Sequence, residues 1–427
     1  MDHALARRHL LLAGLAAAGW GGAAALPLDA RRARLTADFE PAAAVWLGYD
    51  AGHEAFTAEL ARALHPHVPL KLLVRDDESE AAARALLALH GVPAERVQWL
   101  QHPAAMFFVR DALVFGLAPD GGLGVVDFRW THYGWPAWCR GRRGLANCGV
   151  VDPGPAATLD RELAAQLGAA VFTSALAMEG GGVESNGQGL LIANEALWTS
   201  RNPQLPRSAI ERELRRLPGV RQVVWLPAGL AQDPLHRGRV VGRYVAWGTG
   251  GHTDEFVRFA DPRTVLLAWP DEAEAARHPV ARLNLQRMRR NLEILQAVRD
   301  PQGRPLTVLK LPLPRVVERP VRLAADADPT WSRGWSASLL PPGAGWRDGD
   351  EVIQVAAAST LNFVVANGVV LVPDYRRHGT PERQHRQVLE VLGRAFPGRQ
   401  LVEVDAIGAN WVGAGAHCAT LNEPRVG

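Results

Sequence analysis

The chain has 427 residues, a hydrophobic fraction of 48%, a charged fraction of 21% and a formal net charge of +3. This composition is typical of a globular protein with a large core and excludes a disordered chain. The small net charge gives no electrostatic indication of a nucleic-acid partner, and the length suits one large domain or two ordinary ones.

The first thirty residues differ from the rest of the chain. Arg7-Arg8 precede an apolar run, Leu10–Ala18, which a small-residue segment, Gly21–Ala25, follows. This order predicts an export signal over residues 1–30 that is removed from the mature protein, and the paired arginines favour the twin-arginine route. A membrane anchor is the alternative, but the run is short and diluted by Gly and Ala. We therefore expect an exported protein, periplasmic or secreted, with residues 31–427 as one catalytic domain and no stable membrane insertion.

Short apolar runs and amphipathic stretches alternate from about residue 36, which predicts an α/β fold. The Pro-, Trp- and Gly-rich segment 329–350 is expected to be a long surface excursion. No GxGxxG, phosphate-loop, CxxC or HExxH motif occurs, so neither a nucleotide nor a metal site is indicated. The predicted strands are 43–48, 70–74, 263–269, 307–311, 362–372 and 401–404, and the predicted helices are 56–64, 78–89, 281–298 and 382–396.

The chain contains three cysteines. In an oxidising compartment Cys139 and Cys148 could close a short loop, which would leave Cys418 as a free thiol. Nearness in sequence does not ensure disulfide geometry, so this pairing stays open. Cys418 lies in a run of small residues, Gly413–Thr420, and by itself such a cysteine is more often a small buried hydrophobe in a tight turn.

Polar residues stand out in three glycine-rich or apolar surroundings. Arg110-Asp111 end an apolar run, Glu179 opens a Glu-Gly-Gly-Gly segment, and His252 and Asp254 flank one residue. In an extended segment the last two would project to the same side. Each group alone has an ordinary explanation, either a surface ion pair or a turn.

Together with Cys418, these groups fit one chemistry. A thiolate needs an electrophile, and a nearby histidine can favour the thiolate and shuttle protons. Several carboxylates suit a planar cation, because they clamp a guanidinium through paired, charge-assisted hydrogen bonds. Such a cation would place its central carbon against the sulfur, and its charge would also favour the thiolate.

These motifs resemble those of the agmatine deiminase and bacterial, Porphyromonas-type, peptidyl-arginine deiminase family of guanidine-modifying enzymes. The resemblance covers nearly all of the chain after the signal. Each motif is short, but their order and spacing together are specific. The matching segments are Glu40–Leu47, Arg110-Asp111, Val126–Phe128, Glu179–Gly181, Ser200–Pro203, Gly251–Asp254, Val257–Phe259, Asn362-Phe363, Asn367-Gly368, Val372-Pro373 and His417–Thr420.

The resemblance implies a five-bladed, pseudo-symmetric α/β propeller, or pentein, with the active site on its axis. It implies Cys418 as the nucleophile, His252 as the acid and base, and Glu179 alongside. The full catalytic set that it implies is Cys418, His252, Glu179, Asp254 and Asp111. The residues that it implies for substrate binding are Asp111, Asp254, Arg110, Phe108 and Asn362.

The resemblance also implies a reaction without a metal or an organic cofactor. Sulfur would attack the guanidinium carbon, ammonia would leave, and water would hydrolyse the amidino–thioether to a ureido product. The expected substrate is agmatine or a related small guanidine. The alternatives are a peptidyl-arginine deiminase acting on arginyl peptides or proteins, and a catalytically silent guanidine-binding protein of the same fold. The sequence does not indicate the oligomeric state.

Several positions near the motifs depart from the agmatine deiminase pattern, and they put agmatine itself in question while leaving the chemistry intact. Segment Pro234–Gly248 looks like an insertion that carries three arginines and His236. Basic residues near a pocket for cations are unexpected unless they face solvent or meet a substrate carboxylate. The other departures are Phe108 for Trp, Leu113-Val114 for Gly-Pro, Gly182 for Asn or Ser, Asn186 for Asp and Thr360 for Tyr.

Overall fold

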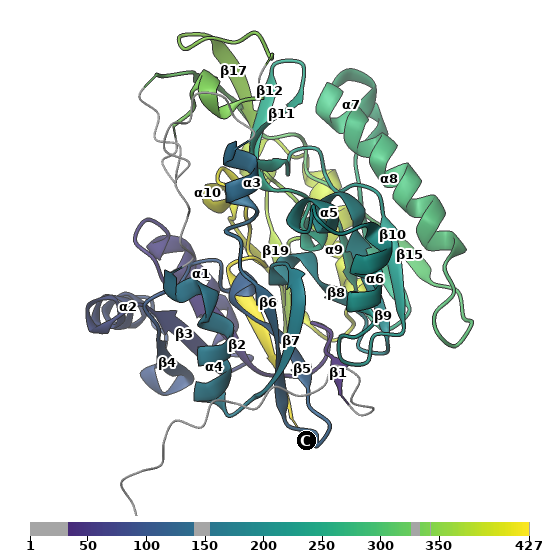
Figure 1. The fold of residues 1–427 in the computed structure, drawn as a ribbon. Coiled ribbons are helices and arrows are strands. Elements are labelled where there is room, and N and C mark those ends of the chain that lie inside the picture. The colour runs from purple at the N-terminus through teal and green to yellow at the C-terminus, as the bar shows by residue number, and fades with distance from the viewer. Residues whose placement is uncertain (1–32, 141–153, 326–333, 342, 427) are drawn as a thin grey trace, which may run out of the picture.

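The fold is described from a computed structural model, which describes residues 33–140, 154–325, 334–341 and 343–426 (Figure 1). Both the predicted export signal and Cys148 lie outside the described residues. Strands and helices alternate along the chain, as expected for an α/β protein. The helices are α1 Glu54–Leu64, α2 Asp77–Leu89, α3 Trp135–Arg140, α4 Leu159–Leu167, α5 Glu195–Arg201, α6 Arg207–Leu214, α7 Glu272–Arg277, α8 Pro279–Ala297, α9 Glu382–Ala395 and α10 Ile407–Asn410.

Five of the described sheets share one pairing pattern, and we call them blades. In each blade a first strand pairs antiparallel with a second strand, which pairs parallel with a third. At least one helix connects the second strand to the third. The blades are β21 Thr420–Pro424, β2 Ala42–Gly48 and β3 Leu70–Val74; β5 Val114–Leu117, β6 Leu123–Arg129 and β7 Ala170–Ala177; β8 Glu184–Ser185, β9 Leu190–Asn194 and β10 Gln222–Leu226; β13 Val257–Phe259, β14 Thr264–Trp269 and β15 Thr307–Pro312; β18 Val364–Ala366, β19 Val369–Pro373 and β20 Gln400–Val404.

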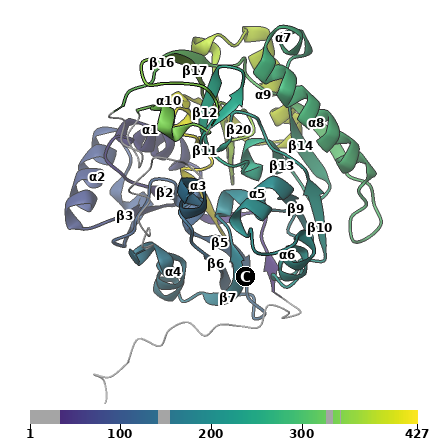
Figure 2. The same cartoon turned by 45° about the horizontal axis from the view of Figure 1, so that its top comes forward.

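The blades surround a common centre, and helices such as α2, α4, α6 and α8 lie on the outside (Figure 2). Two short edge strands, β4 Val97–Gln101 and β1 Arg34–Leu35, extend the first two blades. The ring closes where β21, near the end of the chain, pairs with β2. Trp46 Nε1 donates to Glu423 Oε2 at 2.8 Å, and Lys71 forms an ion pair with the same carboxylate at 2.6 Å. The predicted five-bladed α/β propeller is confirmed.

A sixth sheet lies outside this repeat, at the top of Figure 1, and we call it the inserted sheet. Segment Pro234–Gly248 forms its antiparallel hairpin, whose two strands pair His236 with Gly248. The Arg237 guanidinium stacks on the Trp247 ring, 3.9 Å from the ring centre. The strands in sheet order are β11 Leu235–Val241, β12 Tyr244–Thr249, β17 Glu351–Val355 and β16 Glu318–Arg322.

Two expectations about local structure need correction. The predicted single strand 362–372 is two antiparallel strands, β18 and β19, because the chain turns at Asn367-Gly368. The Asn367 side chain fixes this turn against the first blade, since it bonds both the N–H and the carbonyl of Ala42. In segment 329–350, the surface excursion is confirmed only in part: residues 343–350 are exposed or half-buried, whereas Trp335 and Leu340 are buried against Trp247.

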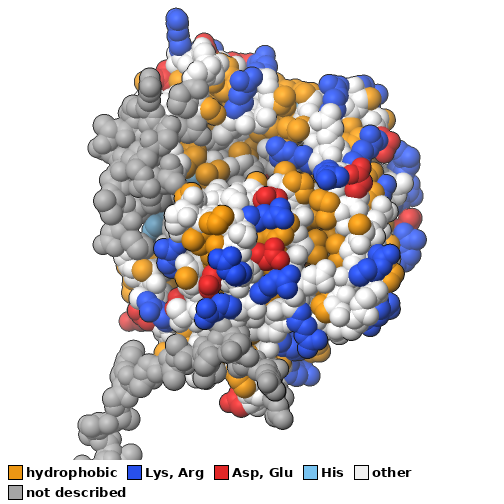
Figure 3. Space-filling model, turned by 45° about the vertical axis from the view of Figure 1, so that its right-hand side comes forward, with side chains coloured by type: hydrophobic (Ala, Val, Ile, Leu, Met, Phe, Trp, Pro, Cys, Tyr) orange, Lys and Arg blue, Asp and Glu red, His pale blue; other side chains and the backbone are white. Residues whose placement is uncertain are grey.

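The strands form where apolar residues can be buried on both faces. Every residue of β9 and of β19 is buried, as expected for strands in the middle of a sheet with helices on one side and neighbouring blades on the other. No helix of the described residues is long and apolar enough to cross a membrane. On the face shown in Figure 3, Lys and Arg side chains are dispersed among acidic and apolar ones.

Candidate active site

The loops that precede the first strand of each blade meet at the centre of the ring. We call them the site loops, and hydrogen bonds join them directly. Gly181 N–H donates to Asp111, His252 contacts Glu179, and Asn362 donates to Cys418. The ring therefore delivers every predicted site motif to one place. The site loops are 108–113, 179–183, 252–256, 359–363 and 415–419.

Cys418 is buried, with 3% of its surface exposed. Its thiol donates to Asp254 Oδ2 at 3.6 Å, and its sulfur accepts from Asn362 Nδ2 at 3.3 Å. Burial raises the pKa of the Cys418 thiol well above its ordinary value, and the neighbouring carboxylates of Asp254, Glu255 and Asp111 raise it further. The sulfur is therefore a thiol until positive charge arrives beside it.

His252 is held as a cation by buried carboxylates. Its Nε2 lies 3.2 Å from Glu179 Oε2, and Glu179 accepts from Arg201 Nε at 2.8 Å. Although burial opposes the charged form, Asp111 and Glu179 raise the pKa of His252 to about 9. Burial also raises the pKa of Glu179, but Arg201 and His252 outweigh it and lower that pKa to about 2. A protonated imidazole is thus available as an acid next to Asp111 and Asp254, the carboxylates that also act on Cys418.

Gly181 explains why the Glu179 loop is rich in glycine. A Cβ at this position would overlap His252 Nδ1 and would lie 3.2 Å from Asp254 Oδ2. The His252 and Asp254 side chains therefore both lie against the backbone of Gly181, which has no side chain. The expected extended segment is wrong, because Thr253–Glu255 form a 3-10 turn. The two side chains still approach the same centre.

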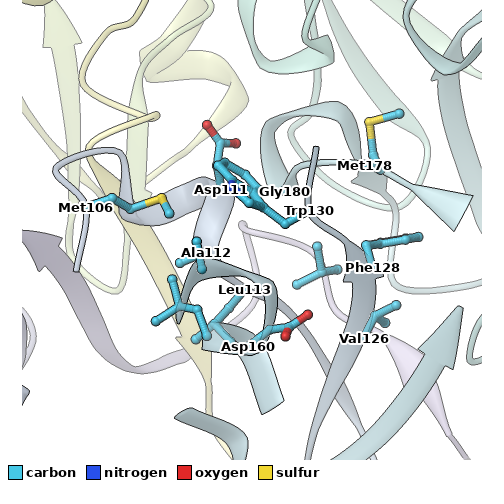
Figure 4. A pocket seen from close by; sticks show the side chains of 13 residues that line it. Met106, Asp111, Ala112, Leu113, Val126, Phe128, Trp130, Asp160, Met178 and Gly180 are labelled. Carbon is cyan, nitrogen blue, oxygen red and sulfur yellow. The ribbon is translucent and has the colours of Figure 1, made fainter. Parts of the chain in front are cut away.

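Asp111 presents its carboxylate to the centre of the ring. Its Oδ1 accepts from Gly181 N at 3.0 Å and its Oδ2 accepts from the Tyr133 hydroxyl at 2.9 Å. Burial raises the pKa of Asp111 to about 6. Figure 4 shows the small cavity beneath it, where Met106, Met178 and Trp130 make the surroundings largely apolar and the Asp111 carboxylate points away from Asp160.

Asp254 belongs to a second chain of buried charges. Its Oδ2 lies 2.7 Å from His417 Nδ1, and His417 Nε2 lies 2.5 Å from Asp38 Oδ2. Asp38 in turn pairs with Arg110 at 3.1 Å and with Arg258 at 2.9 Å. Burial and the two guanidinium groups lower the pKa of His417. These contacts hold the Asp254 carboxylate in its orientation through His417.

Arg110 does not contact the nucleophile with its side chain. Its Nε donates to the Thr420 carbonyl at 3.0 Å, and its Nη1 pairs with Asp38. Its backbone N–H donates to the Cys418 carbonyl at 3.2 Å. These contacts favour a structural role, which ties the Asp111 loop to the Cys418 loop, over the substrate-binding role that the sequence suggested.

Asn362 aims one amide N–H at the sulfur. Its Oδ1 accepts from His417 N at 2.8 Å, and its Nδ2 donates both to Cys418 Sγ and to Glu255 Oε1, the latter at 3.0 Å. Glu255, Asn362 and Cys418 each lie two residues before the first strand of their blade. Burial raises the pKa of Glu255 well above its ordinary value. Sequence reasoning missed Glu255, although it directly follows Asp254.

An aromatic cavity of about 560 Å³ leads to the nucleophile. Phe108, Tyr133, Trp247 and Val412 line it and also line the narrow space that contains Asp111 and Cys418. Phe108 therefore stands between the cavity and the sulfur, as expected of a residue that contacts substrate. Tyr133 and Trp247 were not predicted, since no motif marks them.

Most other departures from the family pattern have structural roles. A Cβ at Gly182 would overlap Met178 Sδ, so this site packs too tightly for Asn or Ser. Asn186 Nδ2 donates to the Pro262 carbonyl at 2.8 Å, and Thr360 Oγ1 donates to the Pro312 carbonyl at 2.6 Å. Their side-chain bonds run to backbone groups and not to Cys418.

Among the described residues, Asp254, Glu255 and Cys418 bring possible metal-ligand atoms within 4.8 Å of one another. Cys139 is disulfide-bonded, and its expected partner, Cys148, lies outside the described residues. Cys418 is free.

A ring of five blades with a cysteine, a histidine and carboxylates at its centre defines a guanidine-modifying enzyme fold. Residues 34–424 match the Porphyromonas-type peptidyl-arginine deiminase family, so the chain belongs to that family. The agmatine deiminase of Stutzerimonas stutzeri is 28% identical over 389 residues, which cover 89% of each chain. That of Pseudomonas fluorescens is 28% identical over 375 residues and 87% of each chain.

Solved structures share the fold. The agmatine deiminase of Enterococcus faecalis superposes with a TM-score of 0.69 at 22% identity and covers 94% of this chain and 98% of its own. The substrate-bound agmatine deiminase of C. jejuni superposes with a TM-score of 0.64 at 16% identity and covers 92% of this chain and 97% of its own.

Proposed function

We propose that the protein is a guanidine iminohydrolase, which converts agmatine or a related small guanidine to its ureido product and ammonia. The observation that carries the proposal is the position of the Cys418 sulfur among the buried carboxylates of Asp111 and Asp254, which also act on the protonated His252. The agmatine deiminases among the relatives support it. A planar cation is the ligand whose charge and hydrogen-bond donors would complement these carboxylates.

The residues around the sulfur suggest a reaction sequence. Asp111 and Asp254 clamp the guanidinium, and its positive charge lowers the pKa of Cys418, whose proton passes to solvent. The thiolate attacks the guanidinium carbon and forms a C–S bond. His252 then gives its proton to one nitrogen, which leaves as ammonia when its C–N bond breaks.

Hydrolysis of the amidino–thioether completes the cycle. His252, now neutral, takes a proton from water, and the hydroxide attacks the same carbon. The C–S bond breaks, Cys418 departs as a thiolate, the hydroxyl proton passes to solvent, and the neutral ureido product forms. A proton from solvent then returns Cys418 to its thiol form. Asn362 favours this departure, because its amide N–H already points at the sulfur.

The cavity beyond Phe108 supports an alternative substrate. About 560 Å³ is more than an agmatine tail requires, so an arginyl peptide also fits the available space. That alternative would yield peptidyl-citrulline. A catalytically silent guanidine-binding protein is the third possibility, and the intact set of Cys, His, Glu and Asp argues against it.

One assay distinguishes these functions. The mature protein is offered agmatine, free arginine and arginyl peptides while ammonia and ureido product are measured, with Cys418→Ala as the control. We expect turnover of agmatine and none by the variant, which should still bind agmatine. Turnover of peptides alone would select the second function, and tight agmatine binding without turnover would select the third. Wild-type activity in Cys418→Ala would contradict the mechanism.

We also propose that the protein is exported, with residues 1–30 as a removed signal and residues 31–427 as a single catalytic domain. The composition of the first thirty residues supports this. The test is expression of the full chain in a bacterial host, followed by fractionation and N-terminal sequencing. A cytoplasmic protein that retains its first residues would contradict the proposal.

A further inference from the structure

His236 brings an imidazole from the inserted sheet to the nucleophile. It lies in β11, in the segment that departs from the family pattern, and it lines the narrow space around Cys418 together with Asp111 and Tyr133. Only 4% of its surface is exposed. The side chain comes from the inserted sheet and not from a blade. The reaction sequence described above does not use it.

The imidazole of His236 is tightly held. The rings of Trp135 and Trp138 each lie 5.2 Å from it, between ring centres. The Tyr133 carbonyl is a hydrogen-bond partner that favours its protonation. Its backbone φ of 51° is unusual for a residue other than glycine and costs free energy that the surrounding contacts must offset. The residue is thus fixed in an orientation that the local chain does not prefer.

One ring nitrogen of His236 remains unsatisfied. Its Nε2 is buried and has no hydrogen-bond partner among the described residues. In the tautomer with the proton on Nδ1, Nε2 presents a lone pair, and this is the tautomer that the inference requires. Burial and the nearby Arg201 lower the pKa of His236 to about 3, so the ring stays neutral. A buried acceptor without a donor is costly, and such groups normally meet a ligand or water.

We propose that His236 Nε2 accepts an N–H of the bound guanidinium, which makes His236 a substrate-binding residue contributed by the inserted sheet. The inference rests on the proposed function and adds a contact to it. A guanidinium carries N–H donors on all three nitrogens, more than Asp111 and Asp254 need. A neutral acceptor suits the remaining donor, because a further carboxylate would oppose ionisation of Cys418.

This contact also gives the inserted sheet a function. The sequence left open whether its arginines face solvent or meet a substrate carboxylate. Arg243 is half exposed and pairs with Glu351 at 3.1 Å, so it faces outward. Arg239 is also exposed, whereas the buried Arg237 guanidinium stacks on the Trp247 ring. The hairpin side chains that line the narrow space around Cys418 are His236 and Trp247.

The test measures binding of agmatine by calorimetry in the Cys418→Ala background, where no turnover occurs. His236→Leu should raise the Kd by about tenfold or more, the effect of losing one hydrogen bond to a charged group. His236→Gln, which places an acceptor in a similar position, should recover part of that loss. Arg243→Ala, on the same hairpin, should bind normally. Thermal unfolding of each variant identifies a merely structural effect.

A second measurement leaves His236 unchanged. In Cys418→Ala protein labelled at the histidine nitrogens, the NMR signal of His236 Nε2 should be that of an unprotonated nitrogen and should shift when agmatine is added. An unchanged Kd in His236→Leu, or an unchanged Nε2 signal at saturating agmatine, would overturn the inference alone. No binding of any guanidine by the parent protein would overturn the proposed function as well.

Discussion

The five blades and the inserted sheet reach the same centre in different ways. Each blade contributes a loop that precedes its first strand, and these loops carry Asp111, Glu179, His252, Asn362 and Cys418. The inserted sheet contributes side chains from within its strands, and its hairpin has no counterpart in the repeat. The difference indicates that the repeat sets the chemistry, whereas the inserted sheet shapes the space that the substrate occupies. Substitutions in the two regions should therefore affect different kinetic constants.

The largest effect is expected in a site loop, at Glu179. Glu179→Gln removes the charge that holds His252 protonated, so kcat should fall about 100-fold or more. The Arg201 guanidinium would lose its buried carboxylate, which should lower the free energy of unfolding by about 3–5 kcal/mol. Steady-state kinetics and urea unfolding measure both effects.

The matched control is Glu195→Gln. Glu195 pairs with Arg207 at the surface, where such a pair contributes only about 0–1 kcal/mol. Its loss should leave kcat and stability nearly unchanged. If Glu179→Gln behaved like this control, the link from Glu179 to His252 would have no role in catalysis.

The pH profile reports the charges that the site loops hold. Loss of the Cys418 proton should make kcat/KM rise with pH, because burial and carboxylates raise the pKa of the free thiol. Asp111 must be ionised to bind a cation, so below its pKa of about 6 kcat/KM should fall by about a further tenfold per pH unit. His252 must be protonated to act as an acid, so the loss of its proton above a pKa of about 9 should oppose the rise and form the upper limb of the profile. In Glu179→Gln the upper limb should move to lower pH, because one of the groups that raise the pKa of His252 is gone. An upper limb that stays in place would contradict this assignment.

The smallest effect is expected in the inserted sheet, at Trp247. Trp247→Phe keeps an aromatic ring under the Arg237 guanidinium, but the smaller ring presents less area to the substrate cavity. We expect KM to rise a few-fold and kcat to stay within about twofold, because this ring binds the substrate equally in the ground and transition states. Arg239→Ala, an exposed change on the same hairpin, is the control. If Trp247→Phe lowered kcat and left KM unchanged, the blades and the inserted sheet would not differ in the kinetic constant that they affect.

The repeat could be predicted from the sequence because its signals are local. Apolar runs marked β3, β14 and β20 nearly to the residue, and short motifs marked Cys418 and the carboxylates that the structure places around it. The motif at Asn362 marked a side chain that contacts Cys418, although the strand that follows it breaks at Asn367-Gly368. These features depend on residues that are close in sequence.

The rest of the site depends on contacts between distant segments. Tyr133 and His236 both adopt positive φ without being glycine, which no sequence pattern indicates. Tyr133 reaches Asp111 from a segment without a motif. The contacts of Arg110 were not predicted for a related reason: its partner Asp38 lies 72 residues earlier, and nothing in the sequence pairs them. Tertiary packing alone decides these positions.

The pairing of β21 with β2, which closes the ring, has a consequence for how the protein acquires its activity. Trp46 and Glu423 are 377 residues apart, so their hydrogen bond closes a loop that spans nearly the whole ring. Closing such a loop is a late and slow event in folding. Cys418 lies two residues before β21, so the pairing of that strand with β2 helps to bring it to Asn362 and Asp254. We therefore expect a partly folded chain, in which the ring is still open, to lack the assembled site.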